Sequence, residues 1–218
     1  MRFDVVTLFP EIFASVADYG ITSRAKDRGL WNLHCWNPRD VTQDLHRTVD
    51  ERPFGGGPGM VMMAEPLAQT VEVPSYNGRV IAFSPTGKIL TDGRVREFVR
   101  EAEDLILICG RYEGIDERFL DTYVDETVSL GDFVLSGGEL PACALIDAIV
   151  RQIPGAIKEL SYEEESFATG LLDFPHYTRP ETWRGLTVPE VLLTGHHANI
   201  ARWSRKKVLS GLCKIVRK

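Results

Sequence analysis

Runs of apolar residues alternate with stretches of helical periodicity along most of the chain. Residues 3–9, 30–36, 79–84 and 105–109 are β-branched or apolar over short lengths, which predicts strands. The last run is apolar throughout, as is typical of a strand covered on both faces. The chain is therefore expected to contain a sheet with a buried interior.

Helical patterns separate these predicted strands. Residues 92–103 and 142–151 repeat apolar side chains at intervals of three and four, which places them on one face of a helix. A further helix is expected to begin at Pro10-Glu11, because proline suits the first position of a helix. Strands that alternate with helices in this way are typical of an α/β fold with a parallel sheet.

The pattern changes after residue 157. Residues 158–172 are rich in glutamate and lack periodicity, which predicts a linker. Residues 173–218 then form a small helical domain, in which Trp203 is one of the apolar positions of a segment that follows Pro189. The prediction is a body of residues 1–157, a linker and a C-terminal module.

The composition is that of a folded protein, with 218 residues of which 44% are hydrophobic and 26% charged. The net charge of −6 conceals an asymmetry, because residues 174–218 carry nine Lys or Arg and only two Asp or Glu. A basic tail on an acidic body suggests that the tail meets a polyanion, although a solvated helix face has the same composition. Charge alone leaves both interpretations open.

The four cysteines, Cys35, Cys109, Cys143 and Cys213, are scattered and form no CxxC pair. They are expected to be reduced core thiols rather than metal ligands or nucleophiles, and no metal site is predicted. No apolar run reaches the ~18 residues of a membrane span, and the N-terminus lacks a signal-peptide pattern. A cytoplasmic protein without membrane contact is therefore expected.

Glycine is concentrated in four segments, residues 54–59, 84–87, 110–114 and 131–138. Turns alone explain one such segment, but three of the four follow predicted strands, and ligands bind beyond the carboxyl ends of parallel strands. A shared pocket is therefore expected. The segments contain neither GxxxxGK[ST] nor, after the first strand, GxGxxG, so a triphosphate or dinucleotide site is not expected.

Four motifs carry a resemblance to a known family: residues 47–60, 109–118, 131–141 and 176–180. In this order they resemble the bacterial tRNA (guanine-N1)-methyltransferase family, TrmD, of the SPOUT superfamily, and the resemblance covers essentially the whole chain. It implies a parallel sheet with a deep trefoil knot, a homodimer with its active site at the subunit interface, and S-adenosylmethionine as methyl donor. The implied reaction methylates the guanine at tRNA position 37, immediately 3′ of the anticodon. The resemblance also implies that Mg²⁺ assists the reaction, but no residue pattern in the chain indicates where such an ion binds.

The resemblance also implies which residues hold the donor, since they occupy matching positions in these motifs. They are Pro85, Gly110, Tyr112, Glu113, Gly114, Leu130, Gly131, Asp132, Phe133, Val134, Leu135, Gly137, Gly138 and Pro141. Backbone groups of such loops can read the edges of an adenine, while Leu130 and Leu135 cover its faces.

Methylation of guanine N1 requires a base to remove the N1 proton and a cation to stabilise charge on O6. Arg151 matches the family's catalytic arginine, although an arginine at a helix C-terminus also favours the helix dipole. Glu165, followed by Ser-Phe, occupies the position of the family's aspartate base and is one methylene longer. Asp173 is a rival base, and is otherwise expected to orient the guanine or contact tRNA.

A further set of residues is expected to contact tRNA. They come from the motif at residues 47–60, which contains three consecutive glycines, from the motif at residues 176–180 and from the basic tail. They are Asp50, Arg52, Asp173, His176, Arg179, Arg202, Arg205 and Lys206. Two other functions remain possible at this point: a related SPOUT methyltransferase that acts on another RNA, and an RNA-binding module that keeps the donor pocket without catalysis.

Overall fold

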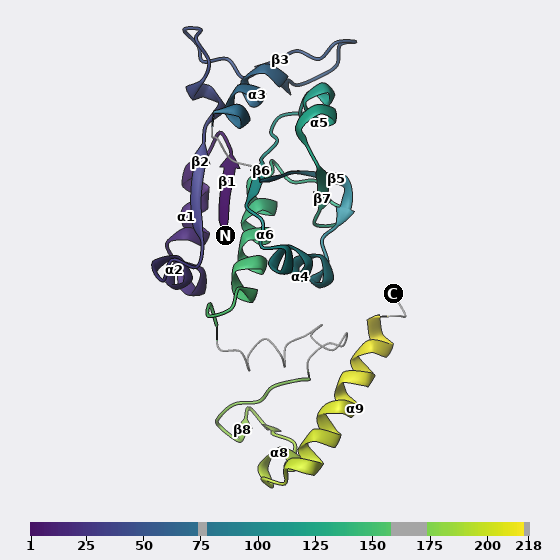
Figure 1. Cartoon of the computed structure of the whole chain (residues 1–218). Coiled ribbons are helices and arrows are strands. Elements are labelled where there is room, and N and C mark those ends of the chain that lie inside the picture. The colour runs from purple at the N-terminus through teal and green to yellow at the C-terminus, as the bar shows by residue number, and fades with distance from the viewer. Residues whose placement is uncertain (74–77, 158–173, 216–218) are drawn as a thin grey trace. The chain divides into compact units, whose positions relative to one another are not determined.

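The computed structural model describes residues 1–73, 78–157 and 174–215, and side chains as far as Val208. The chain divides into two compact units, Met1–Ile157 and Lys158–Lys218 (Figure 1). Among the described residues, no helix combines the length and the apolar character needed to cross a membrane. The predicted linker at residues 158–172 lies outside the described residues.

The strands of the first unit are β1 (Arg2–Val6), β2 (Asn32–Trp36), β3 (Asp50–Glu51), β4 (Val61–Met62), β5 (Arg79–Ile89), β6 (Leu105–Ile108) and β7 (Glu126–Ser129). Its helices are η1 (Pro10–Phe13), α1 (Ala14–Ala17), α2 (Gly20–Asp27), η2 (Pro38–Asp40), α3 (Ala64–Glu72), α4 (Asp92–Glu101), α5 (Glu117–Tyr123) and α6 (Glu139–Gln152).

Five of these strands form one parallel sheet in the order β2-β1-β6-β5-β7. Leu105 and Leu107 of β6 pack into a core shared with α1, α2, α4 and α6, whereas Ile106 and Ile108 face a second core shared with α3 and α5 (Figure 1). All four side chains are buried. The predicted parallel α/β sheet with a doubly covered strand is confirmed.

Several predicted boundaries are wrong by a few residues, and local backbone geometry explains them. β1 ends at Val6 because the Thr7 side chain accepts a hydrogen bond from the Phe9 amide, at 3.0 Å, and turns the chain. α4 ends at Glu101 because Ala102 adopts a left-handed conformation, with φ of 53°. α6 begins at Glu139 rather than at residue 142.

The glycine segment at residues 84–87 was expected to be a loop after a strand, and this prediction is wrong. The segment lies inside β5, where Val128 of β7 pairs with both Phe83 and Lys88, so the intervening residues bulge out of the ladder. Gly87 makes the bulge possible, because a Cβ there would lie 2.6 Å from the Thr127 carbonyl oxygen. The bulge directs Pro85 away from the sheet ladder.

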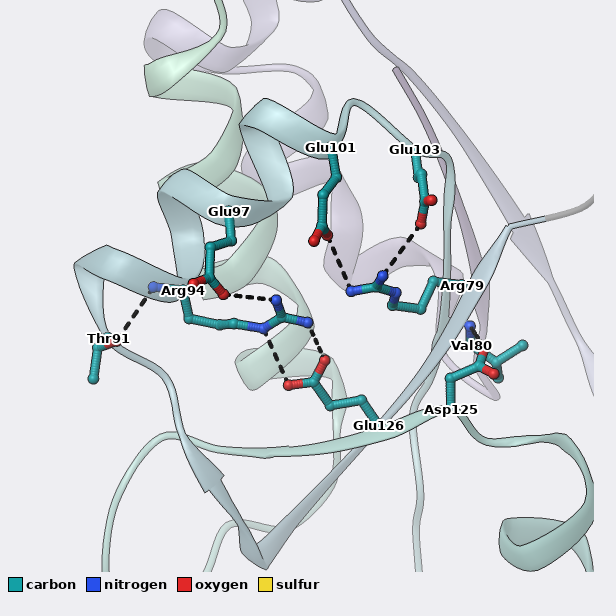
Figure 2. Close-up of polar contacts among 9 residues, drawn as sticks. All are labelled: Arg79, Val80, Thr91, Arg94, Glu97, Glu101, Glu103, Asp125 and Glu126. Carbon is teal, nitrogen blue, oxygen red and sulfur yellow. Dashed lines mark hydrogen bonds and ion pairs between the residues drawn. The ribbon is translucent and has the colours of Figure 1, made fainter.

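Charged contacts hold the edge strand β7 against its neighbours (Figure 2). Arg94 of α4 pairs with Glu126 of β7, to which its Nε donates at 3.1 Å, and with Glu97 of its own helix at 2.8 Å. Asp125 accepts a hydrogen bond from the Val80 amide of β5 at 2.8 Å. These contacts fix the strand that leads into residues 130–138.

The described residues of the second unit, 174–215, form a hairpin and two helices: β8 (Thr182–Trp183), β9 (Leu186–Thr187), α8 (Glu190–Leu193) and α9 (His197–Ile215). The hairpin was not predicted, and the helical segment after Pro189 is interrupted at Gly195, whose φ is 66°. Trp203 lies near the rings of Phe174 and Tyr177, at 6.2 and 6.3 Å between centroids. The half-buried Trp203 side chain therefore lies within a cluster of aromatic rings.

Candidate functional site

A cavity of about 620 Å³ lies at the carboxyl ends of β6 and β7 and at the bulge within β5. Its wall includes β7, the β5 bulge, part of α5 and the segments at residues 110–114 and 130–138, so the structure brings three of the glycine segments together. Every residue that the resemblance assigns to the donor lines this cavity except Asp132. The volume lies within the ~300–1,000 Å³ typical of small-ligand sites.

Close backbone packing between two loops forms the back of the cavity. The Gly138 amide donates to the Gly110 carbonyl at 2.9 Å. A Cβ on Gly138 would lie 2.7 Å from Cys109 Cα, so no side chain fits between the two loops. The start of α6 therefore rests directly on the loop that follows β6.

Tyr112 links the cavity to the segment that contains β3. It has a φ of 61°, and its hydroxyl accepts a hydrogen bond from Arg39 Nη2 at 3.4 Å. Partial burial, followed by the charge of the neighbouring Asp50, raises the pKa of the Tyr112 phenol. Asp50, expected from the sequence to contact tRNA, thus lies beside the loop at residues 110–114.

Gly59 brings the end of the triple-glycine segment against Glu113. A Cβ on Gly59 would lie 2.4 Å from Glu113 Cγ, and the Glu113 amide donates to the Met60 carbonyl at 2.9 Å. Residues 54–57, in contrast, are absent from the described lining of the cavity, and Phe54 is almost fully exposed. The segment therefore touches the site at one end only.

The cavity wall is acidic. The carboxylates among the described lining residues are Glu113, Glu117, Asp121, Asp125 and Glu126, of which Glu126 is paired with Arg94. Arg111 is the one Lys or Arg in that lining, and it is paired with Glu139. A wall of this charge favours a ligand that carries positive charge. Sequence reasoning missed Arg111, although it lies within the motif at residues 109–118.

The family model described as "tRNA (Guanine-1)-methyltransferase TrmD" matches residues 1–214. A tRNA (guanine-N(1)-)-methyltransferase of Thiobacillus denitrificans is 59% identical, over 96% of this chain and 92% of that protein. Proteins of the same name from Herminiimonas arsenicoxydans and Pseudomonas putida are 54% and 56% identical, over 98% and 96% of this chain and 90% and 85% of their own lengths.

The chain belongs to the TrmD family. Among the residues that the TrmD resemblance assigns to catalysis, Arg151 is described and is half-buried near the end of α6, outside the lining of the cavity. Its neighbour Gln152 donates to Asp92 of α4 at 3.1 Å, which fixes the end of the helix. Glu165 and Asp173 lie outside the described residues.

The residues that the TrmD resemblance assigns to tRNA are distributed over both units. Asp50 and Arg52 lie in and after β3 of the first unit, and Arg52 is exposed. The others that the structure describes are exposed residues of the second unit: His176, Arg179, Arg202, Arg205 and Lys206. His176 also packs against Phe174, with 4.8 Å between ring centroids.

Proposed function

We propose that this protein transfers the methyl group of S-adenosylmethionine to N1 of the guanine at tRNA position 37. The observation that carries the proposal is the cavity beside the β5 bulge and the carboxyl ends of β6 and β7, which gathers the expected donor residues in a chain of the TrmD family. Two relatives named tRNA (guanine-N(1)-)-methyltransferase match this chain over 92% and 90% of their own lengths. Because tRNA is the substrate, we also propose a cytoplasmic location.

The residues of the cavity fit this donor. S-Adenosylmethionine, when bound, supplies an electrophilic methyl group on a positively charged sulfur, and the acidic wall favours such a cation. The segments at residues 110–114 and 130–138 line the cavity with glycine-rich backbone, which can come close enough to an adenine edge to hydrogen-bond to it. Leu130 and Leu135 provide apolar surface for its faces.

The reaction needs one proton acceptor and one cation from the protein. We assign the acceptor to the Glu165 carboxylate, which takes the N1 proton as the new N1–carbon bond forms and the sulfur–carbon bond breaks. We assign the cation to Arg151, whose guanidinium stabilises the charge that develops on guanine O6. Asp173 orients the guanine in this proposal.

In this proposal one part of the chain binds the methyl donor and the other binds tRNA. Residues 1–157 form the SPOUT-type donor domain with its deep trefoil knot, residues 158–172 form a linker, and residues 173–218 grip tRNA phosphates through their basic side chains. We further propose a homodimer with the active site at the subunit interface. Phe133 and Val134 support this, because they line the cavity and yet are half or more exposed in one subunit.

Mg²⁺, which the family resemblance implies, receives no site in this proposal. Over residues 1–73, 78–157 and 174–215, no group of three or more His, Cys, Asp or Glu side chains is placed to hold a metal ion. No step of the proposed reaction is assigned to the ion.

One assay tests the reaction. The purified protein is incubated with methyl-labelled S-adenosylmethionine and tRNA transcripts that carry guanine or adenine at position 37, and the product nucleoside is identified. N1-methylguanine from the guanine transcript alone is the expected result. Label at another position, at a ribose or in the adenine transcript would contradict the proposal and point to another RNA methyltransferase.

A second experiment separates the two carboxylates. Glu165→Gln is expected to retain binding of the donor and to lose turnover by about 10²-fold or more, because the N1 proton then lacks its acceptor. Asp173→Asn is expected to raise the KM for tRNA more than it lowers kcat. Normal turnover by Glu165→Gln would show that the base is assigned to the wrong residue.

A further inference from the structure

A buried ion pair lies behind the cavity, outside the chemistry assigned so far. Arg111 Nε and Glu139 Oε2 are 2.9 Å apart, and the Glu139 side chain is 1% exposed. The other oxygen of this carboxylate accepts a hydrogen bond from Thr7 Oγ1 at 2.9 Å. Glu139 thus joins the turn after β1, the loop after β6 and the first residue of α6.

Arg111 carries this restraint to the cavity. Its Nη1 donates to the Ser136 carbonyl at 3.0 Å, and its guanidinium lies 4.5 Å from the centre of the Phe9 ring. Arg111 and Ser136 both line the cavity, whereas Glu139 is not among the described residues of that lining. Any effect of Glu139 on a bound ligand must therefore pass through other residues.

Gly137 leaves room for this pair. A Cβ on Gly137 would lie 2.4 Å from Arg111 Nε and 2.6 Å from Glu139 Oε2. A buried ion pair is weak evidence for stability, because well-packed apolar residues stabilise a core equally well. It does restrict the direction of the guanidinium, which the ion pair with Glu139 and the hydrogen bond to Ser136 hold from two sides.

We infer that Glu139 is a positioning residue for the methyl donor. It holds the Arg111 guanidinium in the orientation that ties residues 130–138 to residues 110–114, so that both loops are in place before the donor arrives. The inference rests on the proposed function, since it takes S-adenosylmethionine as the ligand of this cavity. A loop that is already ordered loses less conformational entropy when the ligand binds, which gives tighter binding.

The test compares two buried carboxylates. Glu139→Gln removes the charge that orients Arg111. Asp4→Asn is the matched control, because Asp4 is also 1% exposed, lies 2.7 Å from Arg2 Nε and accepts from Trp36 Nε1 at 2.8 Å, but is not in the described lining of the cavity. Calorimetry measures the Kd of S-adenosylmethionine for each folded variant, and urea unfolding measures its stability.

We expect both substitutions to lower stability, and Glu139→Gln alone to raise the Kd of the donor, by about tenfold. The kcat at saturating donor is expected to change less than the Kd, because Glu139 does not touch the reacting atoms. Equal donor Kd values for Glu139→Gln and Asp4→Asn would overturn the inference. Failure of the native protein to bind the donor would instead overturn the proposed function.

Two further variants keep the test decisive. Thr7→Val removes the hydrogen bond to Glu139, together with the one that the Thr7 hydroxyl accepts from the Phe9 amide, while the charge of Glu139 remains. It is expected to fold and to raise the donor Kd by a smaller factor in the same direction. Should Glu139→Gln not fold, an unchanged Kd in a folded Thr7→Val counts against the inference. In a double-mutant cycle, Arg111→Gln combined with Glu139→Gln is expected to bind the donor no more weakly than Arg111→Gln alone. Additive losses would show that Glu139 acts by a route other than Arg111.

Discussion

At the residue scale, the atoms around a glycine decide whether a larger side chain fits at that position. At Gly138 the nearest atoms to an added Cβ belong to the backbone of Cys109 and Gly110, which cannot rotate away. At Gly93 of α4 the nearest is Thr91 Oγ1 at 3.8 Å, an ordinary contact. The two glycines therefore respond in opposite ways to the same substitution, although the sequence does not distinguish them.

Gly138→Ala is expected to destabilise the protein by about 1–3 kcal/mol, since the extra methyl group forces the two loops apart. The donor Kd is expected to rise in parallel. Gly93→Ala, its control, is expected to stabilise the protein by about 0.5–1 kcal/mol because alanine is the better helix former. Urea unfolding and donor titration measure both effects, and a neutral Gly138→Ala would mean that the loops are not in contact.

The thiols of the first unit are expected to be unreactive. Burial raises the pKa of Cys35 to about 11 and also raises the pKa of Cys109 and of Cys143. At a pH below the pKa, a higher pKa means a smaller fraction of thiolate. At pH 8 only about one Cys35 side chain in 10³ is therefore the reactive thiolate. Iodoacetamide is expected to label Cys35 in the native protein far more slowly than in urea, as peptide mass spectrometry will measure. Rapid native labelling would contradict the burial of this side chain.

At the element scale, the structure differs from the sequence predictions where two segments interact. The pattern at residues 79–84 predicts a strand that stops at its glycine segment, but β7 pairs with the chain on both sides of that segment and extends β5 to Ile89. Local periodicity cannot report such pairing, because it depends on a strand more than thirty residues away. The helix over residues 92–103 was predicted well because its signals are local.

The N-terminus of α4 is held by one such local signal. The Thr91 hydroxyl accepts a hydrogen bond from the Arg94 amide at 3.3 Å. Thr91→Ala is expected to cost about 1 kcal/mol of unfolding free energy, the usual loss for an N-cap. Thr122→Ala, an exposed site inside α5, is expected to change stability by only a few tenths of a kcal/mol. Similar losses at both threonines would show that the cap contributes nothing specific.

For the whole molecule, charge separates the two parts of the chain. The exposed basic residues of α9 belong to a segment with nine Lys or Arg and two Asp or Glu, while the rest of the chain is acidic. The basic tail had two interpretations from sequence, a contact with a polyanion and a solvated helix face. Salt dependence distinguishes them, because only bound phosphates release counterions.

Arg202→Gln together with Arg205→Gln is expected to weaken tRNA binding and to reduce the slope of log K against log[salt] by about 0.7–0.9 for each phosphate that the variant no longer neutralises. Arg24→Gln together with Arg100→Gln removes the same charge from exposed sites of the first unit and is expected to leave the slope nearly unchanged. Filter binding at several salt concentrations measures both. Equal slopes for the two double variants would favour the solvated helix face.

By itself, the sequence determined the parallel α/β fold, the family and three glycine segments that line the cavity, because these follow from periodicity and from contiguous motifs. Only the tertiary structure decided that residues 84–87 are a bulge within β5, that Asp132 is absent from the described cavity lining, and that Glu139 meets Thr7 across 132 positions of the chain. Contacts of this range leave no local pattern, since each depends on which segments the folded sheet brings together. A buried carboxylate therefore shows its partner only once the chain has folded.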